Sequence, residues 1–341
     1  MSILKKHLET AFVLKLQNKY VVKSNYILYK EIMISILFLI LMLFPSFAAA
    51  SNDITASSYI LVEKNSLQVI TGRDYHKKLA PASTTKVMTT IISLENLKGT
   101  ETVKADNKVI SIPASKLSLT PGREYKAIDL IKGTMVKSAN DAAYTLAVHL
   151  GGDEASFASI MTEKAKEIGA HNTNFMNASG LSDNNQYTTA YDLALILRYA
   201  LENERFREIA ATKYFSFNEG TKNQRYKNHN RFLFCFEPAI AGKTGFTRIS
   251  RHTYVGAFEK NGETYILALL RSNNLWGDAV NILKNLYEEL PSDREIGLAK
   301  SSSAKLTSYK TTKEKKPVAK KKVKKTKKTS SIKKNTIKTV R

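Results

Sequence analysis

The chain has 341 residues, a formal net charge of +23 and one cysteine, Cys235, and 43% of its residues are hydrophobic. That hydrophobic share excludes a fully disordered chain, and a single cysteine excludes a disulfide framework or a cysteine-ligated zinc site. The charge lies mainly at the ends, because residues 1–31 carry +4, residues 301–341 carry +15, and the segment between them carries the remaining +4.

The first recognisable element is an uncharged apolar run over residues 32–44, which is shorter than the roughly 20 residues of a membrane span. A lysine-containing segment precedes it and a small-residue stretch, Ala48-Ala49-Ala50, follows it, which is typical of secretory signals. We expect residues 1–50 to be a signal peptide cut after Ala50, or an N-terminal anchor if uncleaved. Met1 and Met33 are both possible starts. The protein is then exported to the periplasm, the outer face of the cytoplasmic membrane or the cell wall.

Residues 51–295 are expected to form one domain in which strands enclose a helical middle. Period-two patterns predict strands at residues 58–63, 67–70, 253–258 and 264–270. Helical periodicity is found at residues 84–95, 127–137, 140–150, 153–169, 189–203 and about 275–290. Strands from opposite ends of the domain would pair in one antiparallel sheet, and the helices would cover it.

Ser83 and Lys86 are the first candidate catalytic residues. Residues three apart share a face of a helix, so the hydroxyl and the amine can meet. A serine hydroxyl is a poor nucleophile unless a base takes its proton. A lysine can be that base only if burial or a nearby positive charge lowers its pKa. The spacing alone is weak evidence, because Ser-x-x-Lys recurs in the lysine-rich ends.

The tripeptide Lys243-Thr244-Gly245 precedes a predicted strand and is a stronger signal. The lysine and the threonine would bind a substrate carboxylate as a point charge and a hydroxyl donor. Gly245 would let the substrate backbone approach closely. The charge of Lys243 would also lower the pKa of Lys86.

Ser138 and Asn140 lie at the break between two predicted helices. Ser138 would pass a proton between Lys86 and a leaving amine, and Asn140 would hydrogen-bond a substrate amide. A competing Ser-Asp-Asn sequence stands at residues 182–184, where an Asx-type loop is the alternative interpretation.

The three motifs, in this order, resemble those of the serine D-Ala-D-Ala carboxypeptidases, the low-molecular-weight penicillin-binding proteins. The resemblance covers about residues 55–290 and rests on residues 79–89, 135–143, 165–169, 177–193 and 242–247. It implies an α+β fold of the β-lactamase/transpeptidase type, with a five-stranded antiparallel sheet, helices on both sides and a helical subdomain. It also selects Ser138 over Ser182, because Ser138 keeps the flanking residues of the family.

The resemblance further implies that the enzyme removes the terminal D-Ala from peptidoglycan stem pentapeptides through an acyl-enzyme on Ser83. Lys86 is then the general base, Ser138 carries the proton to the leaving amine, and Lys243 with Thr244 holds the terminal carboxylate. β-Lactams would acylate the same serine, and no metal or cofactor is expected. The sequence departs from the family at residues 250–251, where Ser-Arg replaces Ala-Gly.

Three alternatives remain at this level. A D,D-endopeptidase of peptidoglycan cross-links has the same motifs and is not separated from a carboxypeptidase by sequence. A class A β-lactamase needs a deacylating glutamate, and Glu163 and Glu167 lack the Glu-x-x-Leu-Asn context. A non-enzymatic cationic binder would work through its tail.

Residues 296–341 are expected to be a disordered Lys-rich tail, because they cannot bury enough apolar surface to fold. In an exported protein, a tail of this charge would contact an anionic envelope polymer or a membrane surface rather than nucleic acid. Unchanged envelope retention after deletion of residues 301–341 would contradict this expectation.

Overall fold

The computed structural model describes residues 30, 33–35, 54–219 and 222–301. The expected signal peptide or anchor over residues 1–50, and the Lys-rich tail beyond Ser301, lie almost entirely outside the described residues. Within the described part of the chain, no helix has the length and hydropathy needed to cross a membrane.

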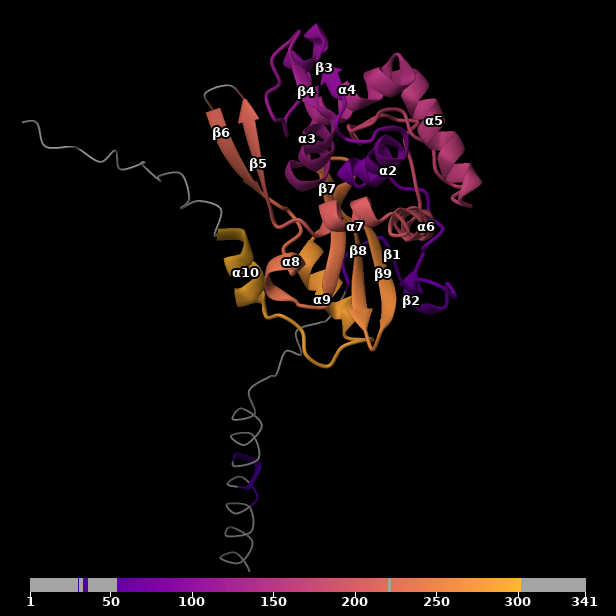
Figure 1. Ribbon diagram of the computed structural model, residues 1–341. Coiled ribbons are helices and arrows are strands. Elements are labelled where there is room, and N and C mark those ends of the chain that lie inside the picture. The colour runs from indigo at the N-terminus through magenta and orange to yellow at the C-terminus, as the bar shows by residue number, and fades with distance from the viewer. Residues whose placement is uncertain (1–29, 31–32, 36–53, 220–221, 302–341) are drawn as a thin grey trace, which may run out of the picture.

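A five-stranded antiparallel sheet forms the centre of the fold, in the order β2-β1-β9-β8-β7 (Figure 1). Its strands are β1 (Ser58–Glu63), β2 (Val69–Arg73), β7 (Ala239–Thr247), β8 (Arg251–Lys260) and β9 (Glu263–Ser272). β1 pairs with β9, and Tyr59 lies opposite Leu269, so the two ends of the domain meet in one sheet. The antiparallel sheet expected from the sequence is confirmed.

Both faces of this sheet are buried along β1, β8 and β9, whereas the edge strand β2 is largely exposed. Alternate side chains of a strand point to opposite faces, so Ile60 and Val62 join one hydrophobic cluster while Tyr59 and Leu61 join another. Helices α2 (Lys86–Asn96) and α6 (Ala190–Ala200) cover the first face, and α8 (Phe232–Cys235), α9 (Leu275–Leu283) and α10 (Asp293–Ser301) lie at the second. The expected α+β architecture with helices on both sides is therefore confirmed.

A largely helical region lies beyond the end of the sheet, in the upper part of Figure 1. Its helices are α3 (Ala127–Lys132), a π-helical turn η3 (Gly133–Lys137), α4 (Asn140–Gly151) and α5 (Glu154–Glu167). Two two-stranded antiparallel sheets border it, β3 (Thr102–Lys104) with β4 (Glu124–Lys126) and β5 (Tyr214–Glu219) with β6 (Lys222–Lys227). The remaining elements are η1 (Ala82–Thr85), η2 (Asn107–Ile110) and α7 (Glu204–Ala211).

The C-terminal helices differ from the expectation in two ways. α9 ends at Leu283 rather than near residue 290, and α10 extends beyond residue 295, where we placed the end of the domain. A capping box explains where α10 begins, since the Glu295 carboxylate accepts from the Ser292 backbone N–H and Ser292 Oγ accepts from the Glu295 N–H. Ile296 is only 2% exposed, so burial stabilises this helix against the domain.

Candidate active site

Ser83 lies in η1, one turn before α2, and Lys86 is the first residue of α2. Lys86 Nζ and Ser83 Oγ are 3.0 Å apart. Hydrogen bonds hold the start of η1 against β8, because the Pro81 carbonyl accepts from the hydroxyls of Thr84 and Thr253. The predicted pairing of hydroxyl and amine within one helical turn is present.

Lys86 is fully buried and has two further partners, the Asn140 Oδ1 atom at 2.7 Å and the Ser179 carbonyl at 2.5 Å. Burial lowers its pKa well below the ordinary lysine value, the charge of Lys243 lowers it further, and Asp141 opposes the shift. A neutral amine has two N–H donors and one lone pair. When Lys86 is neutral and donates to Asn140 and Ser179, its lone pair is left to accept from the Ser83 hydroxyl.

The loop that supplies the Ser179 carbonyl is held by one side chain. Asn177 Oδ1 accepts from the backbone N–H groups of Gly180 and Leu181 at 2.8 and 3.1 Å. Gly180 has a φ of +81°, and a Cβ atom there would lie 1.8 Å from the Ala82 carbonyl oxygen. The close approach of this loop to η1 therefore requires glycine.

We expect Gly180→Ala to lower the free energy of unfolding by about 3 kcal/mol, because the added methyl must displace the backbone of η1. Gly262→Ala is the matched control, since Gly262 also has a φ of +81° but nothing lies within 4 Å of an added Cβ. Urea unfolding of both variants measures the difference. Equal losses in the two variants would mean that backbone conformation, and not the contact with η1, accounts for the effect.

Ser138 and Lys243 form the second half of the site. Ser138 follows the π-helical turn and adopts a left-handed φ of +60°. Its Oγ atom accepts from Lys243 Nζ at 2.9 Å, and Lys243 also donates to the Thr244 carbonyl at 2.8 Å. Lys243 is 2% exposed, and burial lowers its pKa to about 7. A strained serine held by a buried lysine is typical of a functional site.

Asn140 is placed differently from its predicted role. Its Oδ1 atom accepts from Lys86 and its Nδ2 atom donates to the Pro113 carbonyl at 3.0 Å. Both polar ends therefore have protein partners, and the geometry makes Asn140 a residue that positions Lys86. A direct bond from Asn140 to a substrate amide stays a prediction.

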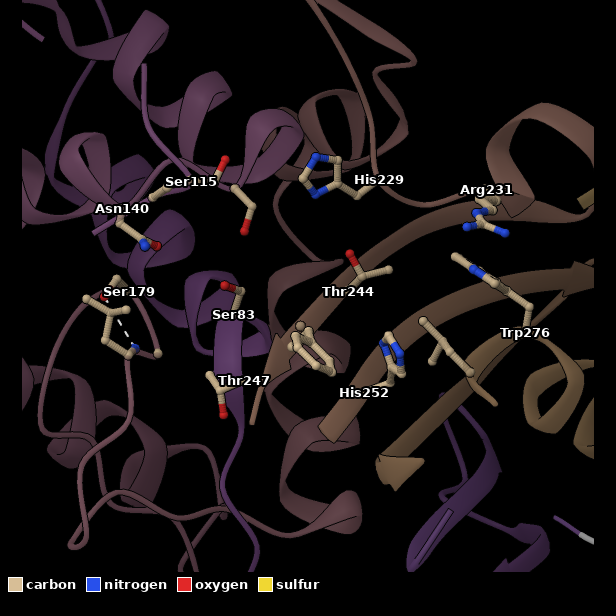
Figure 2. Close-up of a pocket in the computed structure, with 17 residues that line it drawn as sticks. Ser83, Ser115, Asn140, Ser179, His229, Arg231, Thr244, Thr247, His252 and Trp276 are labelled. Atoms are coloured by element: carbon tan, nitrogen blue, oxygen red, sulfur yellow. Dashed lines mark hydrogen bonds between the residues drawn. The ribbon is translucent and has the colours of Figure 1, made fainter. Parts of the chain in front are cut away.

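A cavity of about 330 Å³ lies beside Ser83 and Ser138. Ser83, Ser138, Asn140, Thr244 and Gly245 all line it, so three segments distant in sequence meet there. Figure 2 shows Ser83, Asn140, Thr244 and His229 facing this space, with Arg231 beside Trp276. Lys86 and Lys243 are not lining residues, and their amines reach Ser83 and Ser138 from within the protein.

Gly245 packs closely against the protein itself, and the predicted approach of a substrate backbone to Gly245 stays a prediction. A Cβ atom at Gly245 would lie 2.7 Å from the Ser83 backbone nitrogen. β7 therefore runs directly against the nucleophile segment, which leaves no room for a side chain between the strand and Ser83.

Several lining residues were not identified from sequence. Among them are Ser115, Ser179, His229, Arg231, His252 and Trp276. Ser179 acts through its main chain, which no side-chain pattern reveals, although its segment was matched to the family. His229 and His252 show no metal-ligand spacing in the sequence, such as His-x-x-x-His. Within the described residues, no group of three or more His, Cys, Asp or Glu side chains could hold a metal ion.

The alternative residues considered for the site lie elsewhere. Ser182 is exposed, and Asp183 Oδ1 accepts from the Asn185 backbone N–H in an Asx-type turn. Glu163 and Glu167 are exposed on α5. Among the described residues that line the cavity there is no aspartate or glutamate. A carboxylate placed to activate a deacylating water, as a class A β-lactamase needs, is therefore not seen at this cavity.

Residues 247–251, which include the departure from the family, form a turn held by side-chain hydrogen bonds. The hydroxyls of Thr247 and Ser250 lie 2.8 Å apart, and each accepts from the backbone N–H of the other residue at 3.0 Å. Arg251 adopts a φ of +55°, a conformation that glycine favours, and its Nε donates to Asn273 Oδ1. Arg251 does not line the cavity.

A family sequence profile described as D-alanyl-D-alanine carboxypeptidase matches residues 46–274. The chain is 35% identical to D-alanyl-D-alanine carboxypeptidase DacB2 of Mycobacterium tuberculosis, over 66% of this chain and 78% of that relative. It is 31% identical to DacF of Bacillus subtilis, a protein of the same description, over 60% of this chain and 54% of the relative.

Two solved structures are also similar. A D-alanyl-D-alanine carboxypeptidase from Mycobacterium tuberculosis has a TM-score of 0.66 and 31% identity, with 70% of this chain and 95% of that chain covered. The S216A mutant of the Streptomyces K15 DD-transpeptidase has a TM-score of 0.64 and 26% identity, with 69% of this chain and 97% of that chain covered.

Proposed function

The chain belongs to the D-alanyl-D-alanine carboxypeptidase family of serine peptidases, and from this premise we propose how its site removes the terminal D-Ala from a peptide ending in D-Ala-D-Ala. The observation that carries the proposal is the arrangement around Lys86 Nζ. This buried amine lies 3.0 Å from Ser83 Oγ, and its other two partners are acceptors.

In the first step, Lys86 accepts the Ser83 proton while Ser83 Oγ bonds to the carbonyl carbon between the two D-Ala residues. The resulting oxyanion is stabilised by backbone N–H groups, for which that of Ser83 is a candidate donor. The carbon–nitrogen bond then breaks, which leaves an ester on Ser83 and an amine that needs a proton.

We assign the delivery of that proton to Ser138, which gives its hydroxyl proton to the leaving amine and takes up the proton that Lys86 received from Ser83. Its oxygen accepts from Lys243, so its own O–H remains a donor for the leaving amine. Thr244 faces the cavity and Lys243 supplies positive charge immediately behind it, which suits the carboxylate of the departing D-Ala. Water then hydrolyses the ester and regenerates Ser83.

A β-lactam presents the same combination of a reactive carbonyl and a carboxylate, so we propose that it acylates Ser83. No carboxylate is found among the described lining residues, and the ester would therefore hydrolyse slowly. Fast turnover of a chromogenic cephalosporin would instead support the β-lactamase alternative.

The pH dependence of D-Ala release tests this mechanism. Lys86 must be neutral to act as base, so kcat rises with pH through a pKa lowered well below 10.5, and then reaches a plateau. Lys243 must be charged to attract the carboxylate, and in the free enzyme it loses that charge above a pKa of about 7. KM is therefore expected to rise above neutral pH while kcat does not fall, because a bound carboxylate stabilises charged Lys243.

The measurement is D-Ala release from an N-acylated peptide ending in D-Ala-D-Ala, between pH 5 and pH 10, with and without benzylpenicillin. Release that benzylpenicillin does not block would contradict the proposed function. A kcat that still increased like the titration of an exposed lysine would contradict the role of Lys86.

A further inference from the structure

Two large apolar side chains are exposed at the turn between β7 and β8. Ile249, at the tip of the turn, is 62% exposed, and Phe246, near the end of β7, is 55% exposed. Arg248 and Arg251 flank Ile249 and are exposed as well. Single exposed apolar residues are ordinary on soluble proteins, but large apolar side chains beside cations are the combination with which interfacial segments bind anionic membranes.

The turn is held in one shape by the protein itself. The hydrogen bonds between Thr247 and Ser250 close it, and Arg251 Nε donates to Asn273 Oδ1 at 3.1 Å. Ser250 is buried, whereas Ile249 beside it is exposed. A surface that is already ordered loses little conformational entropy when it binds a partner.

The end of the sheet at this turn is positively charged. Arg271, near the end of β9, is a third exposed arginine at this end, because β9 is antiparallel to β8. Residues 246–252 and 270–274 contain no Asp or Glu. Among the ion pairs found in the described part of the chain, none involves any of the three arginines. Their charge is therefore available to an anionic partner.

The N-terminal segment enters the domain beside this turn. Thr55 Oγ1 accepts from the backbone N–H groups of Asn273 and Asn274 at 3.0 and 3.1 Å, and Asn273 in turn accepts from Arg251. The buried Asp278 carboxylate accepts from the backbone N–H and the hydroxyl of Thr55 at 2.7 and 2.8 Å. These bonds fix the start of the domain next to the β7–β8 turn.

The length of the connecting chain limits how far this end of the domain can lie from the N-terminal apolar run. Nine residues, 45–53, separate the uncharged run at residues 32–44 from Ile54. Because an extended residue spans at most about 3.5 Å, the two are no more than about 35 Å apart. Where that run is retained in a membrane as an anchor, the turn is held close to the bilayer. Such tethering makes a weak contact effective, because it raises the local concentration.

We propose that the β7–β8 turn docks on an anionic phospholipid bilayer, with Ile249 inserted among the headgroups and the arginines beside it on the phosphates. This contact goes beyond the proposed function, because it assigns the end of the sheet that faces the membrane. Arg248, Ile249 and Arg251 do not line the catalytic cavity, so the docked residues are distinct from those that meet the substrate. The Lys-rich segment over residues 301–341 would attract the same surface by charge alone. Salt screens that attraction but does not weaken the insertion of an apolar side chain.

Binding of the full chain to vesicles tests the proposal. The vesicles contain equal parts of phosphatidylglycerol and phosphatidylcholine, and about 0.5 M NaCl screens the attraction of the Lys-rich segment. We expect Ile249→Ser to bind about tenfold more weakly than the unmodified protein, because the apolar side chain that leaves water is lost. Ile110→Ser is the matched control, since Ile110 is 68% exposed on η2, and it should bind like the unmodified protein.

Tryptophan fluorescence reports the insertion directly. The chain has one tryptophan, Trp276, whose signal is subtracted with the unmodified protein. The emission of Ile249→Trp is expected to shift to shorter wavelength on vesicles and to be quenched by brominated lipids, whereas Ile110→Trp should show neither effect. This readout does not depend on how tightly the Lys-rich segment binds.

The contribution of the arginines is measured at low ionic strength. Arg248→Gln is expected to bind the vesicles about fivefold more weakly than the unmodified protein. Arg123→Gln is the matched control, because Arg123 is also exposed but directly precedes β4, and its affinity should not change.

Equal binding by Ile249→Ser and Ile110→Ser would overturn the proposal, and so would an Ile249→Trp emission that vesicles leave unchanged. Binding that disappears at high salt in every protein would assign the membrane contact to the Lys-rich segment alone and also overturn it. An Ile249→Trp shift that appears without vesicles and grows with protein concentration would mean that a second copy covers the turn instead of lipid. None of these outcomes depends on D-Ala release, so a failure of the proposed function is distinguishable from each of them.

Discussion

Replacement of Ser83 by alanine is expected to lower D-Ala release by a factor of about 10⁴ or more, and to abolish the covalent adduct with benzylpenicillin. The expected loss is this large because the reaction runs through an ester on Ser83 Oγ. Lys86 and Ser138 act only on protons that this step transfers, so neither can compensate. Intact-protein mass spectrometry after exposure to benzylpenicillin detects the adduct, and amino-acid analysis measures D-Ala.

Ser182→Ala is the matched control for Ser83→Ala. Ser182 begins the literal Ser-Asp-Asn sequence, yet it is exposed and does not line the catalytic cavity. Its adduct and its D-Ala release are expected to equal those of the unmodified protein. An adduct that persists in Ser83→Ala and disappears in Ser182→Ala would reverse the assignment of the nucleophile.

The residues found from the sequence are those whose chemistry is in the side chain and whose partners are local or belong to a motif. Ser83 and Lys86 are three positions apart, so helix geometry alone brings them together. The predicted influence of Lys243 on Lys86 is also present, although the two are far apart in sequence. Neither lysine alone indicated this proximity, and it was predicted only from the three motifs taken together.

The Ser179 carbonyl and strand β6 had no comparable signal. Every residue has a carbonyl, so only the fold shows that this one accepts from Lys86. The residues of β6 are mostly polar and do not alternate with apolar ones, so no strand was predicted there. Arg225 and Lys227 consequently resembled ordinary surface charges. α10 was also missed, although its capping box, Ser292-x-x-Glu295, is visible in the sequence.

The second large effect is expected for Lys86→Gln, which should slow acylation by benzylpenicillin about 10³-fold at every pH. Glutamine offers no basic lone pair to the Ser83 hydroxyl. The substitution also leaves partners of Lys86 unsatisfied within the protein, so unfolding by urea must be measured alongside. A rate close to that of the unmodified protein would show that another group takes the Ser83 proton.

Asn140→Asp distinguishes the base from a merely structural lysine, because it keeps Lys86 and changes only its environment. A carboxylate in place of the Asn140 amide, whose Oδ1 is 2.7 Å from Nζ, favours the charged amine and raises the pKa of Lys86. Acylation at pH 7 should then fall about tenfold or more, and recover as pH rises and Lys86 loses its proton. Lys86→Gln has no proton to lose and should not recover. If Asn140→Asp were equally slow at all pH values, the loss would come from disturbed packing, and the pH dependence assigned to Lys86 would be wrong.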